Sequence, residues 1–182
     1  MAIGLKTPGK LADHATHRGP TPRRVSCAPG GTPRPGRLPS PCSSLYHGGM
    51  ERLDVRTRKR DEFIAITGEV QEVVRRAGIE RGCIVVYVPH TTAGVTINEN
   101  ADPDVAADMI GQLDAMVPWR QPFYAHAEGN TAAHVKASMM GSSATVLIEG
   151  GRLALGTWQG IFFCEFDGPR SRHVLVEVFG KD

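Results

Sequence analysis

Three histidines of this 182-residue chain stand beside acidic, amide and hydroxyl side chains, in stretches that are typical of loops and strand ends. They are His90, His126 and His134. Imidazole changes its charge near neutral pH and is also a common metal ligand. Three histidines from separate loops could hold a zinc ion and leave its fourth position to water. Each could instead form a local hydrogen bond in the core, so the residues alone leave both interpretations open.

The polar neighbours of these histidines are the other candidate functional residues. Glu99 and Glu128 are candidate general bases, and Lys136 is a candidate for stabilising negative charge that develops during a reaction. Arg170 suits bidentate contact with a phosphate or carboxylate group, but it also stands in a Gly-Pro turn whose residues have an ordinary structural interpretation. The candidate substrate-binding residues are Thr91, Thr92, Asn100, Asn130, Gln159 and Arg170.

Residues 50–182 carry the apolar patterns of the strands and helices that must position these groups. Alternating or β-branched apolar residues predict strands over 53–57, 82–88, 94–97, 144–148, 156–166 and 173–179. Helical spacing predicts helices over 70–77, 103–117 and 131–140, with the Asp102-Pro103 pair opening the second helix. That helix has an apolar stripe of Val105, Met109, Leu113 and Met116, which is expected to be buried. Hairpins with segregated helices predict an α+β fold of antiparallel sheets.

Two of the predicted strands, 82–88 and 156–166, are apolar on both faces. In the second, Phe162 and Ile161 belong to opposite faces, as do Phe166 and Phe163. One sheet and one helix layer would cover only one of these faces. We therefore expect the strand over 156–166 to lie near a subunit interface of a closed oligomer.

The first 49 residues differ in composition from the rest. They contain eight Pro and eight Gly, and seven Lys or Arg against one acid, whereas residues 50–182 hold 14 basic and 18 acidic side chains. Such a segment buries too little apolar surface to offset its ordering entropy, so we predict a disordered tail over 1–49. Met50 is also a candidate natural start, with 1–49 as upstream sequence. The mildly acidic remainder disfavours nucleic-acid binding.

Several function classes are excluded by missing motifs. No apolar run approaches the ~20 residues of a membrane-spanning helix. The four cysteines form no C-x-x-C pair, which argues against a thiolate zinc site and favours a reduced, cytoplasmic protein. Neither G-x-G-x-x-G nor a Walker motif is present. His126-x-Glu128 lacks the downstream cysteines of a zinc deaminase, and no G-x-S-x-G motif marks a serine hydrolase. A small-molecule substrate, without membrane or nucleic acid, is the expected partner.

Six motifs occur in order: HTTAG at 90–94, NENADP at 98–103, H-x-EGN at 126–130, AH-x-KA at 133–137, GRL-x-LGTWQ at 151–159 and FDGPR at 166–170. Together they closely resemble the YjbQ-type family, the secondary thiamine-phosphate synthase enzymes. The resemblance covers essentially all of residues 50–182 and none of 1–49. Leu147 and Gly150 depart from the family pattern, where Pro and Asn are common.

This resemblance implies a compact α+β domain that assembles as a homotrimer, with sites near subunit boundaries and a metal-capable pocket at His90, His126 and His134. It also implies a weak activity that joins hydroxymethylpyrimidine diphosphate to a thiazole phosphate and gives thiamine phosphate. Zinc suits three imidazoles, whereas Mg²⁺ on the diphosphate prefers oxygen ligands. Two alternatives stay open: a zinc-dependent hydrolase with Glu99 or Glu128 as base, and a non-catalytic trimeric protein that binds an anion or metabolite.

Overall fold

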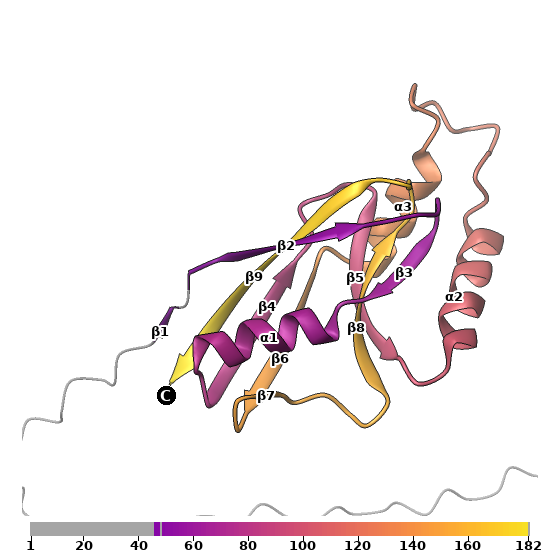
Figure 1. Cartoon of the computed structure of the whole chain (residues 1–182). Helices are drawn as coiled ribbons and strands as arrows, with labels where there is room; N and C mark the ends of the chain where they lie inside the picture. Colours follow the sequence, from indigo (N-terminus) through magenta and orange to yellow (C-terminus); the bar gives the residue numbers. More distant parts are fainter. Residues whose placement is uncertain (1–45, 48, 182) are drawn as a thin grey trace, which may run out of the picture. The chain divides into compact units, whose positions relative to one another are not determined.

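The computed structural model describes residues 46–47 and 49–181 (Figure 1). Most of the predicted tail, residues 1–45 and 48, lies outside the described residues. Tyr46–His47, which the sequence analysis placed in that tail, form strand β1 and pair with Gly180 and Phe179. Regular pairing therefore begins before the predicted boundary at residue 50. Within the described part, no helix is both long and apolar enough to span a membrane.

Six strands of the described chain form one antiparallel sheet, called sheet A, in the order β1-β9-β4-β6-β7, with β2 also paired to β9. Gly150 and Gly151, both with positive φ, make the predicted tight turn between β6 and β7. The strands are β1 (Tyr46–His47), β2 (Glu51–Arg56), β4 (Arg81–Tyr87), β6 (Ser143–Glu149), β7 (Arg152–Leu153) and β9 (Ser171–Lys181).

A second antiparallel sheet, sheet B, has the order β3-β8-β5 (Figure 1). Its strands are β3 (Glu62–Ala65), β8 (Gln159–Glu165) and β5 (Ala93–Glu99), and the helices are α1 (Thr67–Ala77), α2 (Pro103–Met116) and α3 (Thr131–Met140). As predicted, α1 ends at a left-handed Gly78, and the Asp102 side chain caps α2 by accepting from the Asp104 N–H at 2.9 Å. The predicted α+β fold is confirmed.

Strand β8 is buried on both faces by elements of its own chain. Ile161 and Phe163 face the main core, where Val70 of α1 and residues of sheet A meet. Phe162 and Cys164, on the other face, pack in a second cluster that includes residues of α2 and α3. The expectation that one chain cannot cover both faces of this strand is therefore wrong, and the subunit interface that was inferred from it stays a prediction. The helices supply the second cover that the sequence analysis assigned to another subunit.

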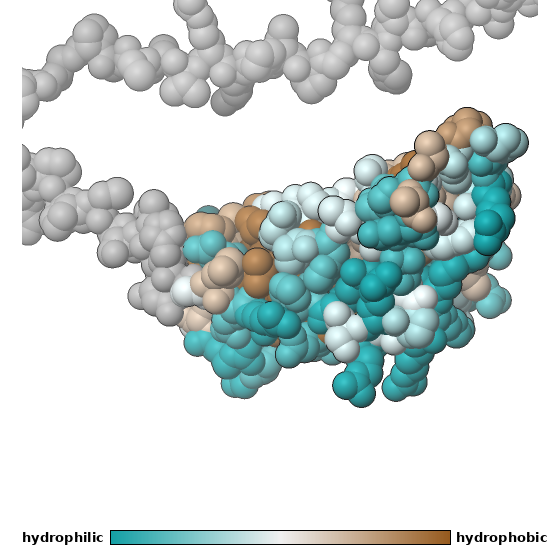
Figure 2. All heavy atoms as spheres, turned by 90° about the horizontal axis from the view of Figure 1, so that it is seen from above, coloured by the Kyte–Doolittle hydropathy of each residue, from teal (hydrophilic) through white to brown (hydrophobic). Residues whose placement is uncertain are grey.

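The outer face of sheet A has no such cover. On β4, Ile84 and Val86 are fully buried, but the alternate residues Val85 and Tyr87 point outward, and Tyr87 is 44% exposed. On β6, Leu147 is 67% exposed. The prediction that the strand over 82–88 is covered on both faces is thus wrong for one chain, since no described helix packs on this side. Figure 2 shows hydrophobic side chains gathered along one border of an otherwise hydrophilic surface.

A buried ion cluster holds α2 and α3 to the sheet. Lys136 of α3 is 0% exposed, and its Nζ pairs with Asp61 Oδ1 at 3.1 Å and with Asp114 of α2. Arg60 Nη2 also contacts Asp114, at 3.0 Å. His134, two residues before Lys136, lies about 200° away around the helix axis and points to the opposite side. Because Lys136 is fully buried and already paired with two carboxylates, the structure of one chain gives no support to its predicted catalytic role.

Replacing Lys136→Met tests the structural role of this cluster. The change leaves the carboxylate of Asp61, 5% exposed, without its lysine partner, although Arg60 still pairs with it. We expect the free energy of unfolding to fall by about 3 kcal/mol, as for other broken buried ion pairs. Chemical denaturation measures the loss. The control Lys59→Met, at an exposed lysine, should change stability little, and equal stability of the two variants would contradict the role.

Candidate functional site

The loop after β4 and the exposed side of α3 enclose a cleft of about 420 Å³, here called the histidine cleft. Imidazole and hydroxyl groups line it, and both can donate hydrogen bonds to the oxygens of an anion. Ser138 stands one turn after His134 on α3, and its hydroxyl donates to the His134 carbonyl at 2.9 Å. The lining residues are His90, Thr91, Ala93, His134, Ala137, Ser138, Gly141 and Ser142.

The histidines of residues 49–181 form two edge-to-face pairs. The ring centroids of His90 and His173 are 4.8 Å apart, and those of His126 and His134 are 5.3 Å apart. His90 and His134 line the same cleft, so one member of each pair faces it. His173 opens β9 and is half-buried against His90. The structure thus adds a fourth imidazole that the sequence analysis left out.

His90 is held in place by the backbone of its neighbour. Its Nε2 lies 3.1 Å from both the amide nitrogen and the carbonyl oxygen of His173. Burial lowers the pKa of His90 below its ordinary value, and the positive charge of Arg172 lowers it further. His90 therefore stays neutral over a wider pH range than a free histidine, and it can hydrogen-bond a ligand without carrying charge.

A buried ion pair that the sequence analysis missed lies directly behind the cleft. Glu165, at the end of β8, is 0% exposed and accepts from Nε and Nη2 of Arg172 at 2.7 Å each. Arg172 Nη2 also donates to Thr92 Oγ1 at 2.8 Å. Thr92, a predicted substrate-binding residue, is therefore buried and already bonded to the protein. The signal in the sequence is a glutamate inside an apolar strand, which is rarely buried without a partner.

Three other predicted residues meet around Asp167. Asn130 Nδ2 donates to Glu128 Oε2 and to Asp167 Oδ2, both at 3.1 Å. Arg170 Nη2 bonds the same Asp167 oxygen at 2.7 Å. Glu128 is exposed and its Oε2 is 3.9 Å from His126 Nε2, which connects this group to the second histidine pair. Asn130 is 5% exposed, so it acts first as a link between loops rather than as a ligand-binding side chain.

Glu99, Asn100 and Gln159 lie at the opposite end of sheet B from the cleft. In the register of β5 and β8, Glu99 pairs with Gln159, whereas Ala93, a cleft residue, pairs with Glu165. The six-residue separation along β5 is about 20 Å. Gln159 Oε1 accepts from the Gly156 N–H at 2.8 Å, as the turn interpretation predicts. One chain therefore does not bring these three predicted residues to the histidine cleft.

A metal ion on three imidazoles requires their nitrogens to converge on one point. Among residues 46–47 and 49–181, no group of three or more His, Cys, Asp or Glu side chains is placed to hold a metal ion. His90 already uses Nε2 for the His173 backbone. The predicted set of His90, His126 and His134 therefore does not fit a metal within one chain.

A second pocket, of about 440 Å³, lies in the loop between α2 and α3. Three ring side chains contribute to it: Trp119, Tyr124 and His126. Arg60 fixes the indole of Trp119, with its guanidinium carbon 4.7 Å from the ring centroid. Since His126 is in edge contact with His134 of the histidine cleft, the imidazole pair stands between the two pockets.

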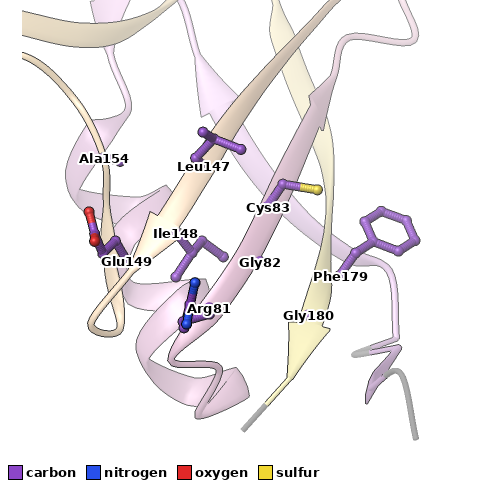
Figure 3. Close-up of a pocket in the computed structure, with 9 residues that line it drawn as sticks. All are labelled: Arg81, Gly82, Cys83, Leu147, Ile148, Glu149, Ala154, Phe179 and Gly180. Atoms are coloured by element: carbon purple, nitrogen blue, oxygen red, sulfur yellow. The ribbon is translucent and has the colours of Figure 1, made fainter. Parts of the chain in front are cut away.

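A larger pocket, of about 700 Å³, lies on the outer face of sheet A. Figure 3 shows Leu147, Cys83 and Phe179 on the neighbouring strands β6, β4 and β9. Cys83 is directly opposite both of the others in register, so the three form one cross-strand row. This surface is apolar and offers no histidine or paired carboxylates. The histidine cleft is the better candidate for chemistry.

Comparison with known proteins decides the family. The sequence model of the family described as UPF0047 protein YjbQ-like matches residues 51–181. This chain belongs to that YjbQ/UPF0047 family. UPF0047 protein YugU of Bacillus subtilis is 53% identical over 131 residues, which are 72% of this chain and 99% of that protein. A UPF0047 protein of Methanocaldococcus jannaschii is 47% identical over 71% of this chain and 93% of its own length.

Solved structures of YjbQ/UPF0047 proteins share the fold. A Clostridium acetobutylicum protein of this family has a TM-score of 0.69 and 52% identity, and the match covers 70% of this chain and 98% of that one. A YbjQ-like protein of unknown function from Sulfolobus solfataricus has a TM-score of 0.72 and 29% identity, over 76% and 100% of the two chains. The names of these relatives assign the family but no reaction.

The lowered pKa of His90 predicts a pH effect on stability. As the pH falls below about 6.5, the unfolded chain protonates this histidine before the folded chain does, so folding stability is lost down to the folded pKa. We expect the free energy of unfolding to fall less between pH 7.5 and 5.5 in His90→Gln than in the unchanged protein. Denaturant unfolding at both values measures this difference, and equal losses would contradict the assignment.

Proposed function

We propose that this YjbQ/UPF0047 protein is an enzyme that binds phosphorylated small molecules in the histidine cleft and transfers a heterocyclic methylene group, as in thiamine-phosphate synthesis. One observation carries the proposal: the cleft and the ring-lined pocket are separated by the contacting imidazoles of His126 and His134. A transfer between two ring substrates requires two adjacent sites of this kind. The cleft suits the phosphate oxygens, and the pocket at Trp119 and Tyr124 suits a planar ring.

This reaction does not require a covalent bond between the protein and the substrate. The bond between the pyrimidine methylene carbon and the diphosphate oxygen breaks, and the diphosphate leaves with the electron pair. The thiazole nitrogen then bonds to that carbon, which gives thiamine phosphate. The main barrier is charge that develops on the leaving diphosphate, so oriented N–H and O–H donors supply the catalysis. The imidazoles of His90 and His134 and the hydroxyl of Thr91 are such donors.

We propose that Mg²⁺ enters this site with the diphosphate, as part of the substrate, because it prefers oxygen ligands. Glu128 is exposed beside His126, in position to contact such a complex. A zinc-dependent hydrolase finds no support in the geometry of one chain, since three ligands do not converge. Zinc on the histidines and a cytoplasmic location stay predictions.

An assay of the full chain with both substrates and Mg²⁺ tests the activity. We expect thiamine phosphate to form, and His134→Ala to lower kcat/KM by about 10²-fold, the usual effect of losing one charge-stabilising donor. Val135→Ala, at the next and exposed residue of α3, is the matched control. An unchanged protein no faster than His134→Ala would contradict the transferase. Thermal stabilisation by substrate without any product would identify a binding protein instead.

We also propose that the chain forms the homotrimer that the family resemblance implies, through the outer face of sheet A. This face exposes Leu147, Tyr87 and Met50, at 67%, 44% and 63%. Exposed apolar surface of this kind is typical of subunit interfaces. Light scattering at micromolar concentration should give a trimer mass, and Leu147→Glu should lower it towards the monomer. A monomer mass for the unchanged chain would overturn this assembly.

A further inference from the structure

The guanidinium of Arg172 is held on one side only. Its Nε and Nη2 contact the two oxygens of Glu165 at 2.7 Å, and Nη2 also contacts Thr92 Oγ1 at 2.8 Å. Glu165 is 0% exposed, and the side chain of Arg172 is 10% exposed. This bidentate geometry leaves the group little freedom to rotate. The position of its remaining nitrogen, Nη1, is therefore fixed by the fold.

Nη1 keeps its two N–H groups for a ligand. No acceptor among residues 46–47 and 49–181 is hydrogen-bonded to it. The buried side-chain atoms without a partner in the same residues are Asn130 Oδ1 and Thr131 Oγ1, so Nη1 is not sealed away from solvent. An arginine that is nine-tenths buried, oriented by a carboxylate and left with free donors is a ready binding group for an oxyanion.

This nitrogen belongs to a residue whose contacts lie next to residues of the histidine cleft. Arg172 directly precedes His173, whose backbone holds His90 at 3.1 Å. Its other contact, Thr92, lies between the cleft residues Thr91 and Ala93. The charge of Arg172 also acts on the His90 ring, which agrees with their closeness. The guanidinium thus lies close to the cleft, behind the lining residues Thr91, Ala93 and His90.

Glu165 does not need the whole charge of Arg172 for its own stability. It also accepts from the backbone N–H groups of Phe166 and Asp167, at 3.1 and 3.0 Å, and from the hydroxyl of Thr57 at 3.2 Å. Hydrogen bonds from several donors stabilise a buried carboxylate strongly. Part of the positive potential of Arg172 is therefore available to an anion in the cleft.

We propose that Arg172 binds a phosphate oxygen of the ligand through Nη1, and that Glu165 is the positioning residue that holds it. The proposal rests on the cleft named under the proposed function and adds its principal phosphate-binding group. The ligand class is a phosphate or diphosphate monoester. The proposed contact between Arg172 and phosphate does not depend on which reaction follows binding.

Binding of inorganic phosphate to the full chain, measured by calorimetry, tests the assignment. Arg172→Gln alone would leave Glu165 charged and unpaired in the core, so the main variant is the double replacement Glu165→Gln and Arg172→Gln, which removes both charges. Arg172→Lys keeps the positive charge but removes the planar guanidinium and its paired N–H donors. Arg75→Gln is the matched control, because it removes one arginine charge at an exposed position of α1.

We expect phosphate to bind the unchanged protein and the Arg75→Gln control equally. The Kd for phosphate should be at least about tenfold higher in the double variant, the loss expected for a charge-assisted hydrogen bond. The Kd of Arg172→Lys should lie between those of the unchanged protein and the double variant. A folded double variant that binds phosphate as tightly as the control would overturn the proposal, as would an unchanged protein that binds none. Phosphate binding lost in the double variant supports it even if no thiamine phosphate is formed, so the two proposals fail separately.

Discussion

The buried carboxylate of Glu165 is the constraint on which the functional end of this fold depends. A charge with no exposed surface must be matched by nearby donors, because desolvation costs several kcal/mol for each ion. The donors come from separate segments: Arg172 from β9, Thr57 from the residue directly after β2, and the backbone after β8. Through Arg172 the loop at Thr92 is fixed as well. One carboxylate thus sets the relative positions of both sheets at the cleft.

The two sides of helix α3 have different roles: one side packs in the protein interior, and the other lines the histidine cleft. Lys136 and Ala133 face inward, where the lysine joins Asp61 and Asp114 in a buried ion cluster. His134 and Ser138, one turn apart, line the histidine cleft. Because the inner side is held by charge pairs as well as packing, the imidazole on the outer side has a fixed position. Fixed donors stabilise developing charge without the cost of reorienting during the reaction.

The two double-faced strands show how local pattern and final burial diverge. The runs around Val85 and Phe163 are equally apolar, and both predict cover on each face. In the fold, α2 and α3 cover β8, while the outer residues of β4 remain exposed beside Leu147. α2 itself buries only Leu113 of its predicted stripe, and Met116 is 57% exposed. The apolar pattern of a strand indicates how many of its faces are hydrophobic. Which element packs on each face depends on the topology of the fold.

The sequence by itself determined the main strands and helices, the antiparallel α+β class and the cap at Asp102, because these follow from local spacing. The tertiary structure alone decided which polar residues are already bonded to the protein. In the fold, Lys136 is buried, Glu99 lies about 20 Å along β5 from the cleft, and Arg172 lies close to the cleft. Burial and ion pairing depend on contacts between distant segments, which spacing along the chain does not encode.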